Sequence, residues 1–188
     1  MSDPMKYDAL MWKAVFQQGD DDAVREWGAD GILTVLGSDM RAGIGSDSVA
    51  MRTQFGGVND FVPERKKGGF FGVVKKKSPW HDSAVERRSR PVLVVRDGET
   101  KTIRCIDLVI GDIVLLNCDE PKIPADLVLI EGAVAVSERE LTGESALVAK
   151  RPTARMYSET EAQLGSGRAV VCAVGRNTMW ASISAAME

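Results

Sequence analysis

The spacing of apolar residues divides the chain into a helical first part and a strand-rich last part. Apolar positions at helical spacing predict a helix over Met5–Gln18 and a shorter one over Asp22–Trp27, after which Gly28 is expected to interrupt regular structure. A third short helix is expected within residues 46–57. Because these helices are short and only partly amphipathic, we expect their stability to depend on packing against another part of the protein.

From Pro91 onward the pattern changes to short β-branched runs separated by turn residues, which is typical of strands. The Asp97-Gly98 dipeptide predicts a hairpin turn within this region. The expected strands are Val92–Arg96, Lys101–Ile106, Leu108–Ile110, Ile113–Asn117, Leu127–Glu131 and Ala169–Val174. With a closing helix over Thr178–Met187, the pattern predicts a mainly β barrel or sandwich with short helices at both ends.

A basic segment separates the two parts and defines three regions: residues 1–63, a linker over 64–90, and a β domain over 91–188. The linker holds clusters of Lys and Arg on either side of aromatic residues, including Lys75–Lys77. Two interpretations have equal weight. The clusters lie against acidic lipid headgroups, or they form a solvated, flexible connector.

Composition favours a folded, water-soluble chain and excludes several classes of protein. The 188 residues are 44% hydrophobic and 27% charged, which is close to the average for globular proteins. The net charge is -3 and the basic residues are grouped locally, so no nucleic-acid role is expected. No run approaches the roughly 20 apolar residues of a membrane-spanning helix.

The sequence holds little of the equipment of a self-contained enzyme. Cys105, Cys118 and Cys172 form no C-x-x-C pair, so we expect reduced thiols in a cytosolic compartment and no bound metal. His81 is the single histidine and is interpreted as a surface residue of the linker. Three of the four tryptophans are interpreted as packing residues: Trp12, Trp27 and Trp180.

One polar turn carries the candidate chemistry. It lies between two apolar segments and reads Leu141-Thr142-Gly143-Glu144-Ser145. Thr, Gly and Ser permit a tight turn that presents the carboxylate of Glu144 outward. Taken by itself, the turn is equally an ordinary hairpin loop with an exposed glutamate.

Further strings accompany this turn in a fixed order. They are Val109–Leu116 (V-I-G-D-I-V-L-L), Ile123–Asp126 (I-P-A-D), Gly165–Arg168 (G-S-G-R) and Val171–Thr178 (V-C-A-V-G-R-N-T). Together with L-T-G-E-S they resemble the actuator domain of P-type ATPases over Pro91–Met187. A weaker resemblance covers Arg52–Pro63, which looks like the segment before the first membrane helix of calcium pumps, with the plasma-membrane type preferred.

The resemblance implies a fold, a function and a set of partners. The fold is a distorted jelly roll, similar to a double-stranded β-helix. Glu144 activates the water that attacks the aspartyl phosphate of the pump, while Thr142, Gly143 and Ser145 shape the loop. The partners are the phosphorylation and nucleotide-binding domains and the membrane helices of the same pump, which use Mg²⁺ and ATP at the cytosolic face. No cofactor is expected in this chain, which lacks the D-K-T-G-T phosphorylation motif and is expected to be inactive alone.

Two departures and two rival functions accompany the resemblance. Cys118–Lys122 replaces the G-D pair that usually precedes I-P-A-D, and Ser137–Glu140 replaces the usual D-E-S-S with an added charge cluster. A transmembrane hairpin is expected to be missing between Val74 and Arg87, with its flanks joined.

The rival functions are a β-barrel adaptor that contacts acidic lipid or a partner protein, and a small enzyme that uses Glu144 as a general base.

Overall fold

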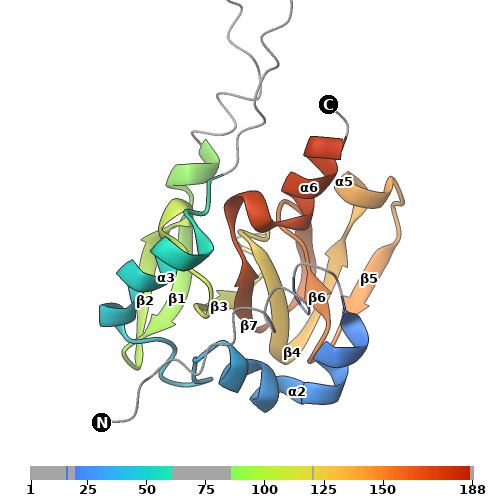
Figure 1. Ribbon diagram of the computed structural model, residues 1–188. Coiled ribbons are helices and arrows are strands. Elements are labelled where there is room, and N and C mark those ends of the chain that lie inside the picture. The colour runs from blue at the N-terminus through green and yellow to red at the C-terminus, as the bar shows by residue number, and fades with distance from the viewer. Residues whose placement is uncertain (1–15, 17–19, 61–85, 120, 187–188) are drawn as a thin grey trace, which may run out of the picture.

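The computed structural model describes residues 16, 20–60, 86–119 and 121–186 (Figure 1). Nearly all of the helix predicted over Met5–Gln18 lies outside these residues, as do Trp12 and His81. The same holds for most of the linker, including Lys75–Lys77. The contact of the linker with lipid and the missing membrane hairpin therefore stay predictions.

Antiparallel strands dominate the described residues, so the prediction of a mainly β protein is confirmed. The strands are β1 (Pro91–Arg96), β2 (Glu99–Arg104), β3 (Ile113–Leu116), β4 (Asp126–Ser137), β5 (Leu147–Lys150), β6 (Arg155–Met156) and β7 (Glu161–Ala173). The helices are α2 (Asp21–Val35), α3 (Val49–Gly56), α5 (Arg139–Thr142) and α6 (Met179–Ala186), with 3-10 turns at Ser46–Ser48, Cys105–Asp107 and Gly175–Asn177. No helix in the described part of the chain is long and apolar enough to cross a membrane.

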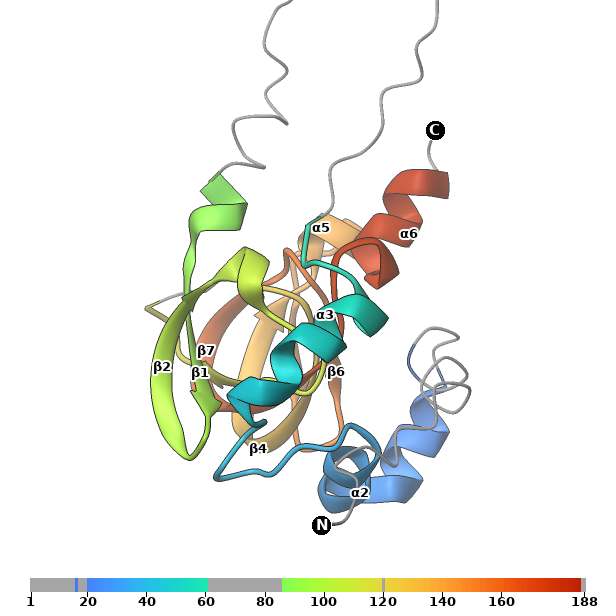
Figure 2. The ribbon, with the colours of Figure 1, turned by 60° about the vertical axis from the view of Figure 1, so that its left-hand side comes forward.

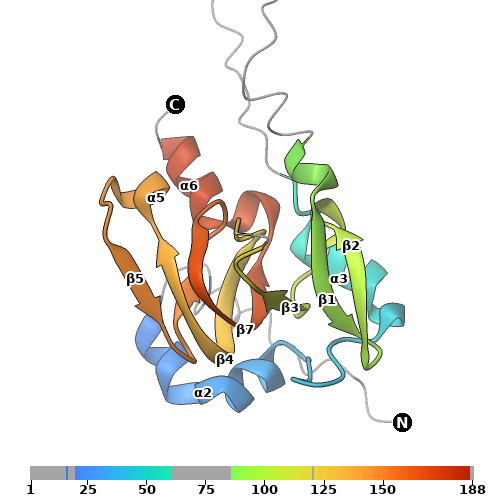
Figure 3. The ribbon, with the colours of Figure 1, turned by 180° about the vertical axis from the view of Figure 1, so that it is seen from behind.

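The strands form one seven-stranded sheet in the order β2-β1-β3-β7-β4-β5, with β6 paired to β4. The long strands β4 and β7 pair along nearly their whole length, and the register shifts in three places bend them. Bending lets the sheet curl around a core of Val, Ile and Leu, so the β1–β2 and β4–β5 hairpins lie on opposite sides of the molecule (Figure 3). The C-terminal end of β4 therefore carries the loop that connects β4 to β5.

Helix α2 corrects the sequence prediction. We expected a helix over Asp22–Trp27 that stopped at Gly28, but α2 runs to Val35 with a kink at Gly28 (φ 63°, ψ 179°). Glycine adopts this conformation without the clash of a Cβ atom. Beyond the kink Ile32 and Leu33 are buried in the core, and this packing outweighs the local cost of the interruption.

Helix α2 covers the end of the sheet opposite α5 and α6 (Figure 2). A buried arginine of β6 holds it there. Arg155 donates to the carbonyl oxygens of Phe16 (3.1 Å) and Asp20 (3.3 Å), and it forms an ion pair with Asp21. Trp27 packs against the core with its ring edge on Phe16, in agreement with its interpretation as a packing residue.

Several strand predictions need correction. Leu108–Ile110 is a buried loop, because the chain turns at Ile110 and Gly111 before it enters β3. The strand expected over Leu127–Glu131 continues to Ser137 as β4, and the strand expected over Ala169–Val174 begins already at Glu161 as β7. The sequence pattern did not predict β5 or β6, whose short runs gain their strand conformation by pairing with β4.

Candidate functional site

The L-T-G-E-S string lies at the tip of the β4–β5 hairpin, at the same end of the molecule as α6 (Figure 1). Its first residues form the single helical turn α5, and the chain then returns to the sheet at Leu147. The structure thus brings the four predicted site residues together on one exposed loop: Thr142, Gly143, Glu144 and Ser145. The sequence pattern predicted a tight turn between two apolar segments, but neither the helical turn α5 nor the strand β5.

Backbone hydrogen bonds give the loop a definite shape. The carbonyl oxygen of Glu138 accepts from the backbone N–H groups of Leu141 and Thr142, both at 2.9 Å. Gly143 ends the turn in the left-handed conformation (φ 78°) and donates its N–H to the carbonyl oxygen of Arg139 at 2.9 Å. The N–H of Glu144 then donates to Oγ1 of Thr142 at 3.2 Å. The backbone of Glu144 is therefore placed by the residues before it.

The side chain of Glu144 is exposed, and within the described part of the chain its carboxylate has no hydrogen-bond or ion-pair partner. An unpaired carboxylate on a shaped loop is free to accept a proton or to orient a water molecule. The four residues thus present one outward-facing carboxylate, and any group on which it could act has to come from outside the described residues.

A nearly buried ion pair lies at the base of the loop. Lys150 Nζ, at the end of β5, is 2.6 Å from Oε1 of Glu138, at the end of β4. The two side chains are only 11% and 13% exposed. The Lys150 ammonium also lies 5.8 Å from the centre of the Tyr157 ring. The sequence analysis noted the charge cluster that contains Glu138 but assigned no partner to it, because Lys150 is 12 positions away in the chain.

The aspartates in two of the four other strings hold parts of the β domain together. Asp112, of the V-I-G-D string, pairs with Arg96 inside the protein. Asp126, of I-P-A-D, accepts from the N–H of Ser158 at 2.8 Å and from that of Met179, the first residue of α6, at 2.7 Å. Both strings therefore maintain the fold that carries the loop.

Burial raises the pKa of Asp126 to about 6, against the opposing effects of two backbone donors and of Arg155. The folded protein binds this proton more tightly than the unfolded chain does. The contribution of Asp126 to the free energy of unfolding is therefore complete below pH 3.8 and is lost as the pH rises to about 6.

We expect this loss to reach up to about 3 kcal/mol and to be missing in Asp126→Asn, which cannot ionise. Urea unfolding of both proteins between pH 4 and pH 7 measures it. The difference in free energy of unfolding between the two proteins isolates Asp126, since other titrating groups cancel. A difference that does not change with pH would contradict the raised pKa.

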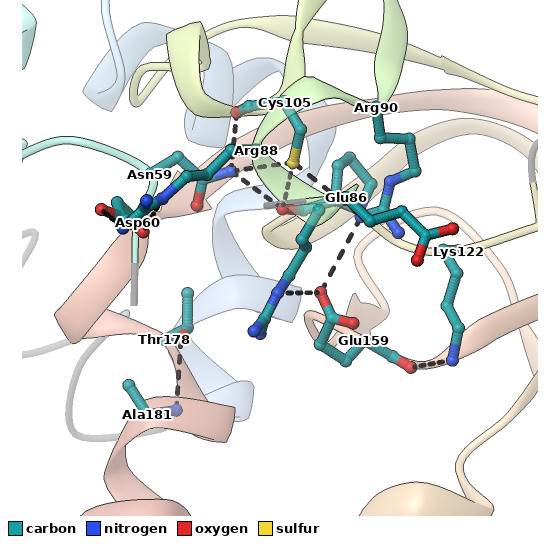
Figure 4. A network of polar contacts seen from close by, with 12 residues as sticks. Asn59, Asp60, Glu86, Arg88, Arg90, Cys105, Lys122, Glu159, Thr178 and Ala181 are labelled. Carbon is teal, nitrogen blue, oxygen red and sulfur yellow. Dashed lines mark hydrogen bonds and ion pairs between the residues drawn. The ribbon is translucent and has the colours of Figure 1, made fainter. Parts of the chain in front are cut away.

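A second polar cluster joins the segment that ends at Asp60 to the segment that begins at residue 86 (Figure 4). The side-chain amide of Asn59 donates to the carbonyl oxygens of Cys105 and Pro124, both at 2.9 Å. Its oxygen accepts from the N–H of Gly175 at 3.1 Å. One side chain thus ties residues 58–60 to three separate parts of the β domain.

Arg88 completes this cluster with a bidentate ion pair to Asp60. Its Nε and Nη2 lie 2.8 Å and 2.6 Å from the two carboxylate oxygens of Asp60. Arg87 and Arg90 lie farther from Glu159, at 3.9 Å and 3.8 Å. Sequence analysis included Asn59 and Asp60 in a resemblance but did not foresee their contacts, which link residues that are far apart in the chain.

The cysteines are free thiols. Burial raises the pKa of Cys105 and of Cys172 above the ordinary thiol value, so both stay protonated at neutral pH. Cys118 is exposed and donates to the carbonyl oxygen of Gly165. Across residues 16, 20–60, 86–119 and 121–186 there is no group of three or more His, Cys, Asp or Glu side chains able to hold a metal ion.

Comparison with known proteins gives a consistent result. The family model of the P-type ATPase actuator domain matches residues 86–188. Calcium-transporting ATPase 10, plasma membrane-type, of Arabidopsis thaliana is 36% identical over 106 residues, which are 55% of this chain and 10% of that protein. Putative calcium-transporting ATPase 13, plasma membrane-type, of the same plant is 41% identical over 90 residues, 46% of this chain and 9% of that protein.

This chain therefore spans about a tenth of the length of these relatives. Among solved structures, a zinc-transporting PIB-type ATPase in its E2.Pi state aligns with a TM-score of 0.46 and 19% identity. That alignment covers 53% of this chain and 16% of the other.

Proposed function

The chain belongs to the family of P-type ATPase actuator domains, and on that premise we propose that it is the actuator of a calcium-transporting ATPase at the cytosolic face of a membrane. The plasma-membrane-type calcium ATPases among its relatives support calcium as the transported ion. The other domains of such a pump supply the phosphorylated aspartate and bind ATP and Mg²⁺. No residue of this chain is assigned to them.

Within this proposal, Glu144 promotes hydrolysis of the aspartyl phosphate. The observation that carries it is the unpaired carboxylate of Glu144 at the tip of a shaped loop. A carboxylate that accepts a hydrogen bond from water orients the water for attack on phosphorus and takes up its proton. Thr142, Gly143 and Ser145 hold the loop in the form that presents Glu144, and the exposed loop is able to approach another domain.

The cluster around Asn59 supports a mechanical role. Residues 58–60 and 86–89 end beside each other at the end of the molecule that also carries α5 and α6 (Figures 1 and 2). We propose that rotation of the β domain is passed to the segments beyond them, because both segments are fixed to it. Phosphate hydrolysis promoted by Glu144 and movement of these segments would then both follow from rotation of the β domain as one rigid body.

Glu144→Gln tests the proposed role in a pump that carries this chain. We expect phosphoenzyme formed from ATP to decay at least about 100-fold more slowly, since the amide cannot accept the proton of water. Formation of the phosphoenzyme should be unchanged. Glu99→Gln, at an exposed glutamate of β2, is the matched control and should decay like wild type. Equal decay in wild type and Glu144→Gln would refute the role.

Two further measurements test the rest of the proposal. The chain by itself should release no phosphate from ATP or from a phosphate ester, because it lacks the phosphorylated group on which Glu144 acts. Phosphate release that Glu144→Gln abolishes would instead support a small hydrolase.

In the pump, phosphorylation by ATP should require Ca²⁺, and phosphorylation that needs another cation would contradict calcium as the transported ion.

A further inference from the structure

We propose that Glu138 and Lys150 are positioning residues, whose ion pair sets the place of Glu144 at the tip of the β4–β5 hairpin. This inference rests on the role proposed for Glu144. It assigns a task to Glu138, one member of the charge cluster at residues 137–140.

The surroundings of the ion pair make it hard for solvent to screen, although the contact is a charge pair without the directional geometry of a hydrogen bond. The two charged atoms are 2.6 Å apart, and both side chains are almost covered by protein. Charges withdrawn from water interact through a lower effective dielectric and are less sensitive to salt than a surface pair. The ring of Tyr157 lies near the ammonium and limits where it can move. The pair therefore ties Glu138, the residue that follows β4, to the last residue of β5, which pairs with Val134 three positions from the loop end of the hairpin.

From Glu138 a short series of hydrogen bonds leads to Glu144. The carbonyl oxygen of Glu138 accepts both the N–H (2.9 Å) and the Oγ1 hydroxyl (3.2 Å) of Thr142. The same hydroxyl oxygen accepts the N–H of Glu144 at 3.2 Å. Moving Glu138 therefore moves Thr142, and with it the backbone of Glu144.

Packing against the hydrophobic core does not hold the loop in place of these hydrogen bonds. The residues from Thr142 to Ala149 are exposed, so the core does not define the position of the tip. The ion pair connects the segment that enters the loop after β4 to strand β5, which leaves the loop. A nearly buried pair adds little net stability, because desolvation of the two charges offsets their attraction. Replacing both partners by apolar residues is therefore expected to change the order of the loop more than the stability of the protein, whereas removing one partner also leaves a covered charge unpaired and lowers stability.

The first test measures that order in the chain itself. In Lys150→Met, which keeps length and removes charge, we expect NMR order parameters of residues 141–145 to fall from about 0.85 to below about 0.6. Amides of β4 and β7 should keep their values. Lys101→Met, which removes the exposed pair with Asp97, is the control and should leave the loop unchanged. Unchanged order in Lys150→Met would overturn the proposal.

The second test measures phosphoenzyme decay in a pump that carries this chain. A loop displaced by about 1 Å can lose up to about 100-fold in rate, and we expect Lys150→Met and Glu138→Gln each to slow decay about 10-fold. Phosphorylation by ATP should be unaffected, and Lys150→Arg, which keeps the cation, should restore most of the rate. A defect that Lys150→Arg does not relieve would contradict a positioning role.

Glu144→Gln measured alongside separates the two levels of inference. If it slows decay while Lys150→Met does not, the proposed function stands and the positioning role is wrong. If Glu144→Gln leaves decay unchanged, the proposed function is wrong and the positioning role falls with it, whatever the order of the loop.

Discussion

Asp112→Asn is expected to lower the free energy of unfolding by about 3–5 kcal/mol, the cost of leaving one charge of a buried pair without its partner. Arg96 and Asp112 are 9% and 0% exposed, and Nε and Nη2 of Arg96 each lie 2.6 Å from a carboxylate oxygen. The Asp112 carboxylate also accepts the N–H of Val109 at 2.9 Å. Asparagine has nearly the same size, so the change removes charge and an acceptor while keeping the volume.

Urea unfolding of the chain checks this expectation. Asp107→Asn is a matched control, because the Asp107 carboxylate pairs with Arg104 in an ion pair whose side chains are 68% and 43% exposed. Exposed pairs contribute under about 1 kcal/mol. Equal losses in the two variants would mean that the buried pair has no special place in the fold.

Gly175→Ala is expected to cost about 2–5 kcal/mol, from its left-handed backbone and from overpacking. Gly175 has φ 55°, and a Cβ atom there would lie 2.2 Å from the carbonyl oxygen of Val58. Backbone, rather than a flexible side chain, occupies that space. Alanine therefore has to push residues 58–60 away from the β domain, and the bond between the Gly175 N–H and Asn59 is lost with them.

Gly98→Ala provides the comparison for this second variant. Gly98 also has a positive φ, 76°, but no atom lies within 4 Å of a Cβ placed there. It should show only the conformational cost of about 1–2 kcal/mol. Urea unfolding gives both values, and amide exchange at residue 175 reports whether the contact with Asn59 opens. If the two variants lose the same stability, residues 58–60 are not held as tightly as the contacts indicate.

The pattern of residues along the chain is sufficient to predict the elements that depend on neighbouring residues. The β1–β2 hairpin follows from β-branched runs on either side of Asp97-Gly98. Helix α6 begins one residue after Thr178, whose hydroxyl accepts the N–H of Ala181. The position of the L-T-G-E-S string between two apolar segments was enough to predict a tight turn that presents Glu144 outward. These features arise from local backbone preferences, which a pattern reveals directly.

Features that join distant parts of the chain could not be predicted without the folded structure. Helix α2 crosses Gly28 because the core buries its second half. Asn59 meets Pro124 and Gly175 across separations that no periodic pattern records. Glu138 meets its partner Lys150 because strands β4 and β5 pair. In each case the free energy comes from contacts between segments distant in sequence, so local preference neither requires nor forbids the result.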